Sequence, residues 1–269
     1  MILQTTRWGE FQPIISPYFI SQIPQFETQK SKACYIARIL RVVPNVRHHF
    51  HKKHIFDHND VDVFMHSWSI DFEKELVDIY KPKKYLFEPQ KEFNQGSLRK
   101  DCIKSRWYSN KISIELKRQY EIENNFEYDF VMVYRFDHIL QKDLIFLNYN
   151  SNNFYASHRD DCTPDNCKCV GNSRYYDAWF FSNSSNMDKF SSLYDNWENY
   201  NLNDPHKDCV HHINVTGLSS KLKFMLYEKT DQFTVRSRIK NCEYKSESEF
   251  NINKLEFFNS HNFERHKWV

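Results

Sequence analysis

Glycine and proline are scarce in this sequence, and long apolar runs are absent. The chain of 269 residues holds four glycines and eight prolines, which argues against a low-complexity segment. No stretch approaches the roughly 18 to 20 consecutive apolar residues that a membrane-spanning helix needs. Residues 1–30 contain no basic segment leading into an apolar core, as a signal peptide would. We therefore expect a soluble, cytoplasmic protein without a membrane span.

Charge of either sign is not in excess. Thirty-seven Lys and Arg residues balance thirty-five Asp and Glu residues, so the formal net charge is +2. A surface that binds nucleic acid by neutralising many phosphates needs a larger positive excess, and nucleic acid is therefore disfavoured as the main partner. The composition is 40% hydrophobic and 17% aromatic, ample for the core of one large α/β domain or two small ones.

The seven cysteines are odd in number and scattered, which is typical of reduced thiols. Cys162, Cys167 and Cys169 are the exception, because with His158 or Cys209 as a fourth ligand they could bind zinc tetrahedrally. Their C-x4-C-x-C spacing lacks the paired C-x2-C knuckles of a strong zinc signature. We favour the alternative of a surface loop rich in Asp, Asn and Pro.

An apolar run that ends in two opposite charges marks the centre of the chain. Residues 130–134 are all apolar or aromatic, as in a strand covered on both faces, and Arg135 and Asp137 follow them. Ligands of open α/β sheets bind beyond the carboxyl ends of such strands. A carboxylate there can hold a divalent cation that clamps a nucleoside diphosphate. The alternative is that Arg135 and Asp137, two apart on one strand face, only pair with each other.

Hydrophobic periodicity predicts strands that alternate with helices before this central strand, a pattern typical of a doubly wound, mostly parallel α/β sheet. The basic, histidine-rich helix at 46–56 is expected to present a solvated face. Expected before the central strand are strands 33–40, 61–66 and 84–88 and helices 46–56, 72–80 and 105–124. Expected after it are strands 144–147, 154–157 and 177–181, helices 187–197, capped by a residue of 182–185, and 205–215, and an antiparallel hairpin of 221–227 with 233–238. The predicted organisation is an N-terminal extension packed on the body (1–32), a catalytic domain (33–239) and a C-terminal extension (240–269).

Several stretches, taken in their order along the chain, carry a family resemblance. They are VDVFMHSW at 61–68, YKPKKY at 80–85, WYSNK at 107–111, YE at 120–121, YDFVMVYRFD at 128–137, DAWF at 177–180 and NMDKF at 186–190. This ordered set resembles nucleotide-sugar-dependent glycosyltransferases of the GT-A type, such as those of bacterial capsule and lipopolysaccharide synthesis and those encoded by large DNA viruses. The resemblance spans roughly residues 33–238, and no single stretch is specific by itself.

The resemblance implies a GT-A-like (Rossmann-like) sheet and a sugar transfer, hexosyl or deoxyhexosyl, from a nucleotide-sugar donor such as a UDP-sugar to a hydroxyl of a saccharide acceptor. In the GT-A pattern an Asp-x-Asp binds the metal and the donor diphosphate. The matching tripeptide here is Arg135-Phe136-Asp137, in which arginine replaces the first carboxylate. Asp137 alone could still ligate Mn²⁺ or Mg²⁺, while Arg135 could contact a phosphate directly, and the metal could even be dispensable.

Further donor-site positions follow from the same resemblance. Arg41 at the end of the first strand, His66 at the end of the second and Lys111 in the long helix resemble donor- or nucleotide-binding residues. For each, a packing or solvated role is the alternative.

Catalytic and metal-binding roles are likewise implied. Asp177 resembles the acidic residue that faces the acceptor and acts as the catalytic base of an inverting transfer; the alternative is a residue that only positions a loop. His206 resembles a late histidine that completes the metal shell, with His211 and His212 as rivals.

Two other classes of function stay open. A nucleotidyltransferase could use the same metal-diphosphate cleft, and a catalytically silent nucleotide-sugar-binding protein could keep the fold. The expected location is the cytoplasm, that of the host if the chain is viral.

Overall fold

The computed structural model describes residues 32–38, 44–136, 138–158, 175–200, 204–227 and 231–234. All of them lie in one compact unit, Ser31–Val269. The predicted extensions, apart from Lys32, fall outside the described residues.

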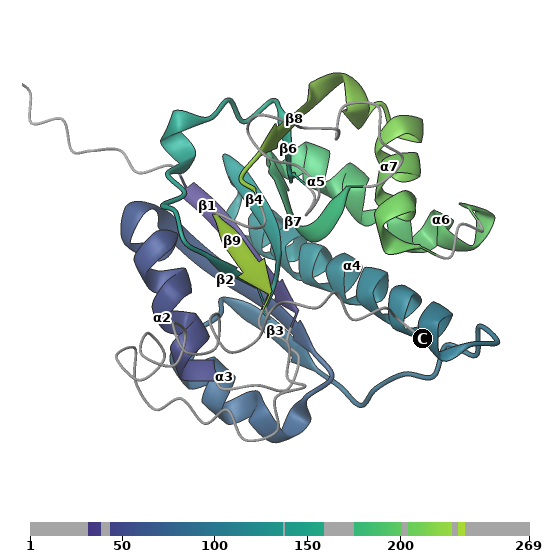
Figure 1. Cartoon of the computed structure of the whole chain (residues 1–269). Coiled ribbons are helices and arrows are strands. Elements are labelled where there is room, and N and C mark those ends of the chain that lie inside the picture. Colours follow the sequence, from purple (N-terminus) through teal and green to yellow (C-terminus); the bar gives the residue numbers. More distant parts are fainter. Residues whose placement is uncertain are drawn as a thin grey trace, which may run out of the picture. The chain divides into compact units, whose positions relative to one another are not determined.

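The described chain forms a seven-stranded sheet in the order β3-β2-β1-β4-β7-β6-β8 (Figure 1). The strands β3, β2, β1 and β4 run parallel, β7 runs antiparallel to β4 and β6, and β8 is parallel to β6. The α/β class is confirmed. The main sheet is mixed, because β7 runs antiparallel to both of its neighbours while the other neighbouring strands pair in parallel. The strands are β1 Lys32–Arg38, β2 Asp60–Ser67, β3 Lys84–Phe87, β4 Phe130–Arg135, β6 Phe154–Ser157, β7 Tyr176–Ser182 and β8 Leu222–Met225.

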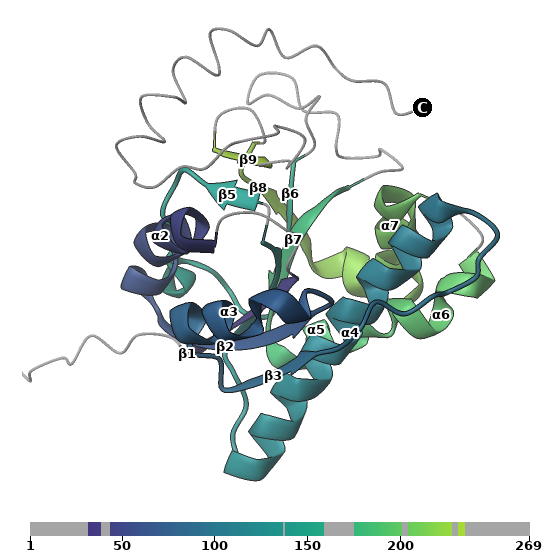
Figure 2. The ribbon, with the colours of Figure 1, turned by 90° about the horizontal axis from the view of Figure 1, so that it is seen from below.

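A second, two-stranded sheet pairs β5, His138–Leu140, with β9, Gln232–Thr234, in antiparallel fashion (Figure 2). The predicted hairpin of 221–227 with 233–238 is therefore wrong, since β8 adds to β6 and β9 adds to β5. The buried side chain of Gln232 explains the choice: its Oε1 accepts from Trp179 Nε1 at 2.6 Å and lies 3.0 Å from His138 Nε2. A hairpin would leave these buried donors without that acceptor.

Helices cover both faces of the seven-stranded sheet (Figure 1). Helices α2 and α3 lie on one face of this sheet, and helices α4 to α7 lie on the other. None of the described helices combines the length and the apolar character that crossing a bilayer requires. The helices are α2 Pro44–His54, α3 Glu73–Tyr80, α4 Leu98–Asn124, α5 Ser184–Ser191, α6 Leu193–Tyr200 and α7 Pro205–Val215, with short 3₁₀ turns η1 Phe56–His58, η2 Ile70–Phe72, η3 Phe146–Asn148 and η4 Leu218–Lys221.

Caps decide where several helices begin. The hydroxyl of Ser97 accepts from the backbone N–H of Lys100, so α4 starts seven residues before the predicted 105. Asn183 caps α5, as predicted for one residue of 182–185. The expected single helix 187–197 is two helices, because the N–H of Ser192 bonds the carbonyl of Lys189, three residues back, and tightens the turn there.

The predicted strand 144–147 is also wrong, because part of it forms η3. The N–H of Phe146 donates to Asn59 Oδ1 at 2.9 Å, and Asn59 in turn donates to the carbonyl of Leu144 at 2.8 Å. These side-chain bonds satisfy the backbone of the segment, which therefore needs no neighbouring strand.

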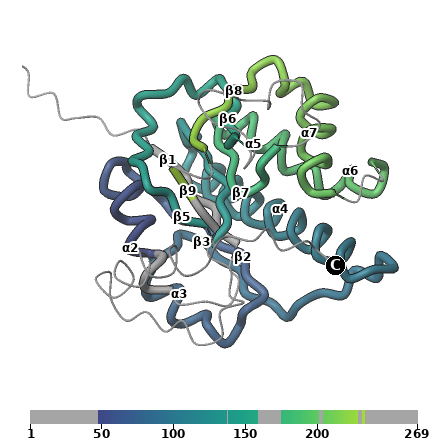
Figure 3. Tube along the Cα trace, viewed as in Figure 1, coloured from purple at the N-terminus to yellow at the C-terminus, as the bar shows by residue number. Residues whose placement is uncertain are grey.

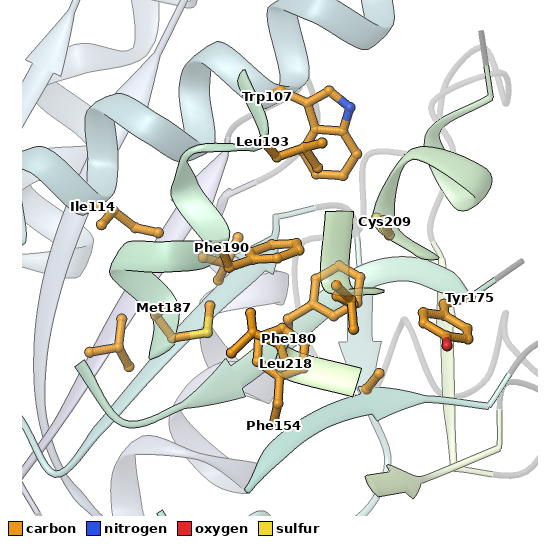
Figure 4. Close-up of a cluster of buried hydrophobic side chains, with 14 of the residues drawn as sticks. Trp107, Ile114, Phe154, Tyr175, Phe180, Met187, Phe190, Leu193, Cys209 and Leu218 are labelled. Atoms are coloured by element: carbon orange, nitrogen blue, oxygen red, sulfur yellow. The ribbon is translucent and has the colours of Figure 1, made fainter. Parts of the chain in front are cut away.

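Aromatic side chains form much of the core on the α4 face (Figure 4). Phe180 of β7 and Phe190 of α5 lie with ring centroids 4.7 Å apart, and Trp107 of α4 meets Phe190 edge-on at 6.2 Å. Burying such rings is the largest stabilising contribution that these elements make. It fixes the position of α4 against the sheet.

Helix α2 is only partly the solvated element that its charges predict. Lys52 and Lys53 are exposed, as expected, but His51 and His54 are buried. The ring of His51 lies 3.0 Å from the hydroxyl of Tyr80 and 3.2 Å from the carbonyl of His138. The expectation is wrong for these two histidines because their turn of the helix faces the sheet.

A buried ion-pair network joins α4 to α5 and to the start of β4. The ammonium of Lys117, fully buried, lies 2.9 Å from Glu121 Oε2, 2.8 Å from Asp188 Oδ1 and 2.5 Å from Ser184 Oγ. The second oxygen of Glu121 accepts from the backbone N–H of Tyr128 at 2.9 Å. Each buried charge is thus paired and hydrogen-bonded, as burial requires.

Candidate functional site

The strand order reverses between β1 and β4. From β1 the chain builds β2 and β3 on one side, and it then returns through α4 to place β4 on the other side of β1. Open α/β sheets bind ligands at such a reversal, beyond the carboxyl ends of the strands. In the register of the sheet, Arg38 of β1 lies between His66 of β2 and Arg135 of β4. The structure thus brings two predicted donor-site residues, His66 and Arg135, to this edge.

Four side chains from four elements meet beside the end of β4. They are Arg106 of α4, Arg135 of β4, Asp177 of β7 and His206 of α7, and we call them the arginine-aspartate cluster. Because β7 is antiparallel to β4, its first residues lie where β4 ends. The cluster unites three of the predicted site residues and adds Arg106.

Asp177 is the centre of the arginine-aspartate cluster. It is only 4% exposed, and its Oδ2 forms an ion pair with Nη1 of the buried Arg106. Its Oδ1 lies 3.8 Å from Arg135 Nη1 and 3.6 Å from His206 Nδ1. The side chain of Arg135 keeps 25% of its surface exposed, so one of the two guanidinium groups remains accessible to a ligand. The two oxygens of Asp177 therefore have different surroundings.

His206 is held by its own helix and by the strand beside it. Its Nδ1 lies 2.7 Å from the carbonyl of Tyr175, and its backbone N–H donates to Asp204, the cap of α7, at 3.0 Å. A ring N–H that donates to a carbonyl places the lone pair of the neutral imidazole on Nε2. His206 can thus offer one nitrogen to a metal ion.

The rivals of His206 lie further along α7. His211 is exposed, with its ring edge-on to Tyr200 at 4.4 Å. His212 is buried, its Nδ1 lies 2.8 Å from the hydroxyl of Tyr200 and its Nε2 lies 3.1 Å from the carbonyl of Lys189. These contacts connect α7 to α6 and α5, so His212 has a packing role.

His66 is buried in an aromatic cluster at the end of β2. Its Nε2 lies 3.1 Å from Glu88 Oε1, and its ring is edge-on to Trp68 at 4.6 Å, while Trp68 stacks on Tyr108 at 5.4 Å. Burial by itself would raise the pKa of Glu88, but hydrogen bonds from His66, Tyr108 and Lys91 outweigh it and lower that pKa. Glu88 is thus held as a carboxylate beside the imidazole.

Lys111 makes its described contacts away from the arginine-aspartate cluster. Its ammonium lies 2.5 Å from Asp195 of α6 and 3.7 Å from Glu115. The hydrogen bond to Asp195 is the main reason that the pKa of Lys111 is raised. Lys111 therefore ties α4 to α6, and the remaining donor-site residues of the prediction, Arg41 and Asp137, lie outside the described residues.

Three of the possible zinc ligands, Cys162, Cys167 and Cys169, also lie outside the described residues. Burial raises the pKa of the Cys209 thiol, and the ring of His158 is stacked on Tyr227 at 4.3 Å. Within the described ranges, no three His, Cys, Asp or Glu side chains are placed to share a metal ion.

The arginine-aspartate cluster itself suits a divalent cation poorly. Arg106 occupies one oxygen of Asp177, and Arg135 lies beside the other. A hard cation such as Mg²⁺ or Mn²⁺ is usually held by carboxylates and other oxygens. Among the described residues, the groups beside the two oxygens of Asp177 are the guanidinium groups of Arg106 and Arg135, and these would repel a cation at Asp177.

Sequence reasoning missed Arg106. Apolar residues at helical spacing, such as Trp107 and Ile112, predict the inward face of α4, and an arginine next to that face is ordinarily solvated. The signal was the polar series at 105, 106, 109, 110 and 113, which recurs at helical spacing and is buried throughout.

Asp208 lies two residues after His206, where α4, α6 and α7 come together (Figure 3). It is fully buried, and its Oδ2 accepts from Trp197 Nε1 at 2.9 Å and from Trp107 Nε1 at 3.5 Å, while its Oδ1 has no hydrogen-bond partner in the described part of the chain. Burial raises the pKa of this carboxyl from 3.8 to about 6. The folded protein therefore keeps the proton of Asp208 to a higher pH than the unfolded chain does.

We expect Asp208→Asn to gain stability relative to the parent as the pH rises from 4 to 7. The folded protein holds the Asp208 proton up to about pH 6 and the unfolded chain releases it near 3.8, so ionisation costs the parent up to about 3 kcal/mol above pH 6. Urea unfolding of both proteins at several pH values measures the difference. Asp195→Asn, at a half-exposed carboxylate, is the control. A difference between parent and Asp208→Asn that does not change with pH would contradict the assignment.

A separate open hollow of about 440 Å³ lies at η2, α3 and β3. It is on the sheet face opposite α4 and does not include the arginine-aspartate cluster. Its lining residues are Ile70, Asp71, Glu73, Lys74, Val77, Asp78 and Tyr85.

Comparison with known proteins gives no family for this chain. A scan against protein-family models finds no match, and a search of curated proteins finds no similar one.

Proposed function

We propose that the chain is a glycosyltransferase of the GT-A type, which moves a sugar from a nucleoside-diphosphate donor to a hydroxyl of a saccharide acceptor. The observation that carries this proposal is the placement of Arg135. It ends the central strand at the reversal of the strand order, and its guanidinium lies 3.8 Å from Asp177. A cation and a carboxylate at this edge are what a transfer with an anionic leaving group needs.

The basic groups would stabilise the departing diphosphate. Guanidinium groups bind phosphate oxygens through two parallel, charge-assisted hydrogen bonds. Arg135, with its partly exposed side chain, is the group placed to make them. Stabilising the negative charge that develops on the leaving group is usually the largest contribution to catalysis in such sites.

Asp177 would take the proton of the acceptor hydroxyl. Arg106 engages Oδ2, so Oδ1 is the oxygen directed toward Arg135 and His206 and is the atom that we assign as the base. A general base must come within hydrogen-bond reach of the attacking oxygen. The ion pair with Arg106 holds the carboxylate in one orientation, which supports this assignment.

The family resemblance adds a Mn²⁺ or Mg²⁺ ion held by Asp137 and His206. When bound, such an ion would neutralise phosphate charge. The described donors supply only the His206 nitrogen, in cationic surroundings, and no step of the proposed reaction is assigned to the ion.

Incubation with UDP-, GDP- and dTDP-sugars tests the proposal. We expect one of them to be consumed with release of free nucleoside diphosphate, and the same nucleotide sugar should raise the unfolding temperature. A ligand present at a hundred times its dissociation constant adds about 2.7 kcal/mol of stability. Release of pyrophosphate would instead identify a nucleotidyltransferase. Binding without any turnover, across a panel of saccharide acceptors, would identify a silent binding protein.

A further inference from the structure

The charge of the arginine-aspartate cluster differs from that of a metal-binding diphosphate site. Two guanidinium groups, those of Arg106 and Arg135, face the single carboxylate of Asp177. The described cluster is therefore net positive before a ligand arrives. Arg38 of β1 is the register partner of Arg135 of β4, so the backbone of a third arginine lies at the same edge of the sheet.

This charge matches a diphosphate directly. A nucleoside diphosphate carries about two to three negative charges at neutral pH. Where the protein supplies carboxylates, a divalent cation bound to them neutralises these charges. Where the protein supplies arginines, the anion and the site are already complementary.

We propose that arginine side chains, with Arg135 in direct contact, neutralise the nucleoside diphosphate in this site in place of a bound divalent cation. The inference rests on the proposed function, because it concerns the donor of that same reaction. It replaces the Mn²⁺ or Mg²⁺ expected from the family resemblance. In this arrangement Arg106 is a positioning residue, since it acts on the ligand through Asp177.

Calorimetric titration of the parent with UDP, GDP and dTDP tests the inference, with each titration done once in EDTA and once in Mn²⁺. We expect one nucleotide to bind under both conditions. Its dissociation constants in EDTA and in Mn²⁺ should differ by no more than about threefold. Binding that requires Mn²⁺ would overturn the inference and leave the proposed function standing. Failure of all three nucleotides under both conditions would overturn both.

Variants of Arg135 sharpen the test. Arg135→Ala should weaken metal-free nucleotide binding about 10- to 100-fold, the usual effect of losing a charge-assisted contact. Arg135→Lys should fall in between, because it keeps the charge and loses the planar fork. The control is Arg118→Ala on α4, where the exposed guanidinium lies 3.2 Å from Asp188 of α5, and it should bind as the parent does.

If the inference holds, Arg135→Asp should make nucleotide binding depend on the metal. It restores the Asp-x-Asp spacing with Asp137, so we expect it to lose metal-free binding and to bind the nucleotide only when Mn²⁺ is present. Thermal unfolding of each variant confirms that it is folded. Metal-free binding by Arg135→Ala and Arg135→Asp at the strength of the parent would overturn the role of Arg135.

Discussion

Replacing Lys117 with alanine should lower the free energy of unfolding by about 3 to 5 kcal/mol. The ammonium is fully buried between Glu121 and Asp188, and its removal leaves the buried carboxylate of Glu121 close to Asp188 without the cation between them. Glu121 also accepts from the backbone N–H of Tyr128, which precedes β4, so the loss extends to the central strand. Urea unfolding followed by circular dichroism measures the effect.

The neighbouring Arg118 supplies a matched control. It pairs with the same Asp188 at 3.2 Å, but its side chain is 48% exposed. Exposed pairs contribute about 0 to 1 kcal/mol, so Arg118→Ala should remain close to the parent. Equal effects of the two substitutions would show that burial does not set the strength of this network. Lys117→Met, which fills the space without the charge, should still destabilise, because the buried Glu121 loses the ammonium that pairs with it.

Replacing Asp177 with asparagine should slow sugar transfer by about 10²- to 10⁴-fold, the usual contribution of a general base. Asparagine keeps the shape of the side chain and a carbonyl oxygen, but it cannot take the proton of the acceptor. Nucleoside diphosphate binding should change far less than turnover, because the proposed contact with the diphosphate is made by Arg135 and not by Asp177. The rate of diphosphate release at saturating donor and acceptor measures the loss of turnover, and calorimetry measures binding.

The burial of Asp177 requires a check on folding. Asp177→Asn removes the charge partner of the buried Arg106, so the assay belongs at a temperature where thermal unfolding shows the variant to be folded. Asp195→Asn, at the half-exposed partner of Lys111, should leave turnover unchanged. If Asp177→Asn loses binding and turnover in equal measure, the carboxylate positions the arginines and another group is the base.

Much of the fold follows from periodicity in the sequence. The sequence predicts both ends of β1, β2, β3, β4, β6, β7, α2, α3 and α7 to within about two residues, and it predicts the last residue of α4 but not its start. Apolar runs and first-turn residues such as Pro205 are local signals. The pairing of β8 and β9 was not predictable in this way. Their partners are distant in the chain and are selected by buried contacts such as those of Gln232.

The residues of the candidate site were likewise predicted only in part. Arg135 is predicted from its place at the end of the central strand, and Asp177 and His206 are predicted through the family resemblance. The structure places Arg135 and His206 each within 4 Å of Asp177. Arg106 was missed, since its polar series at helical spacing does not reveal that this side of α4 is buried or that Asp177 is its partner. The burial of Asp208 was missed for the same reason.

The pairing of β5 with β9 has a consequence for synthesis of the chain on the ribosome. His138 follows the central strand almost immediately, yet its partner in the sheet is Thr234, and its ring shares Gln232 with Trp179. During translation the upstream half can collapse early, but this edge must wait until the codons for 232–234 have been read and that segment has left the exit tunnel. A stop codon before Gln232 would therefore release a chain in which β5 lacks its partner strand β9.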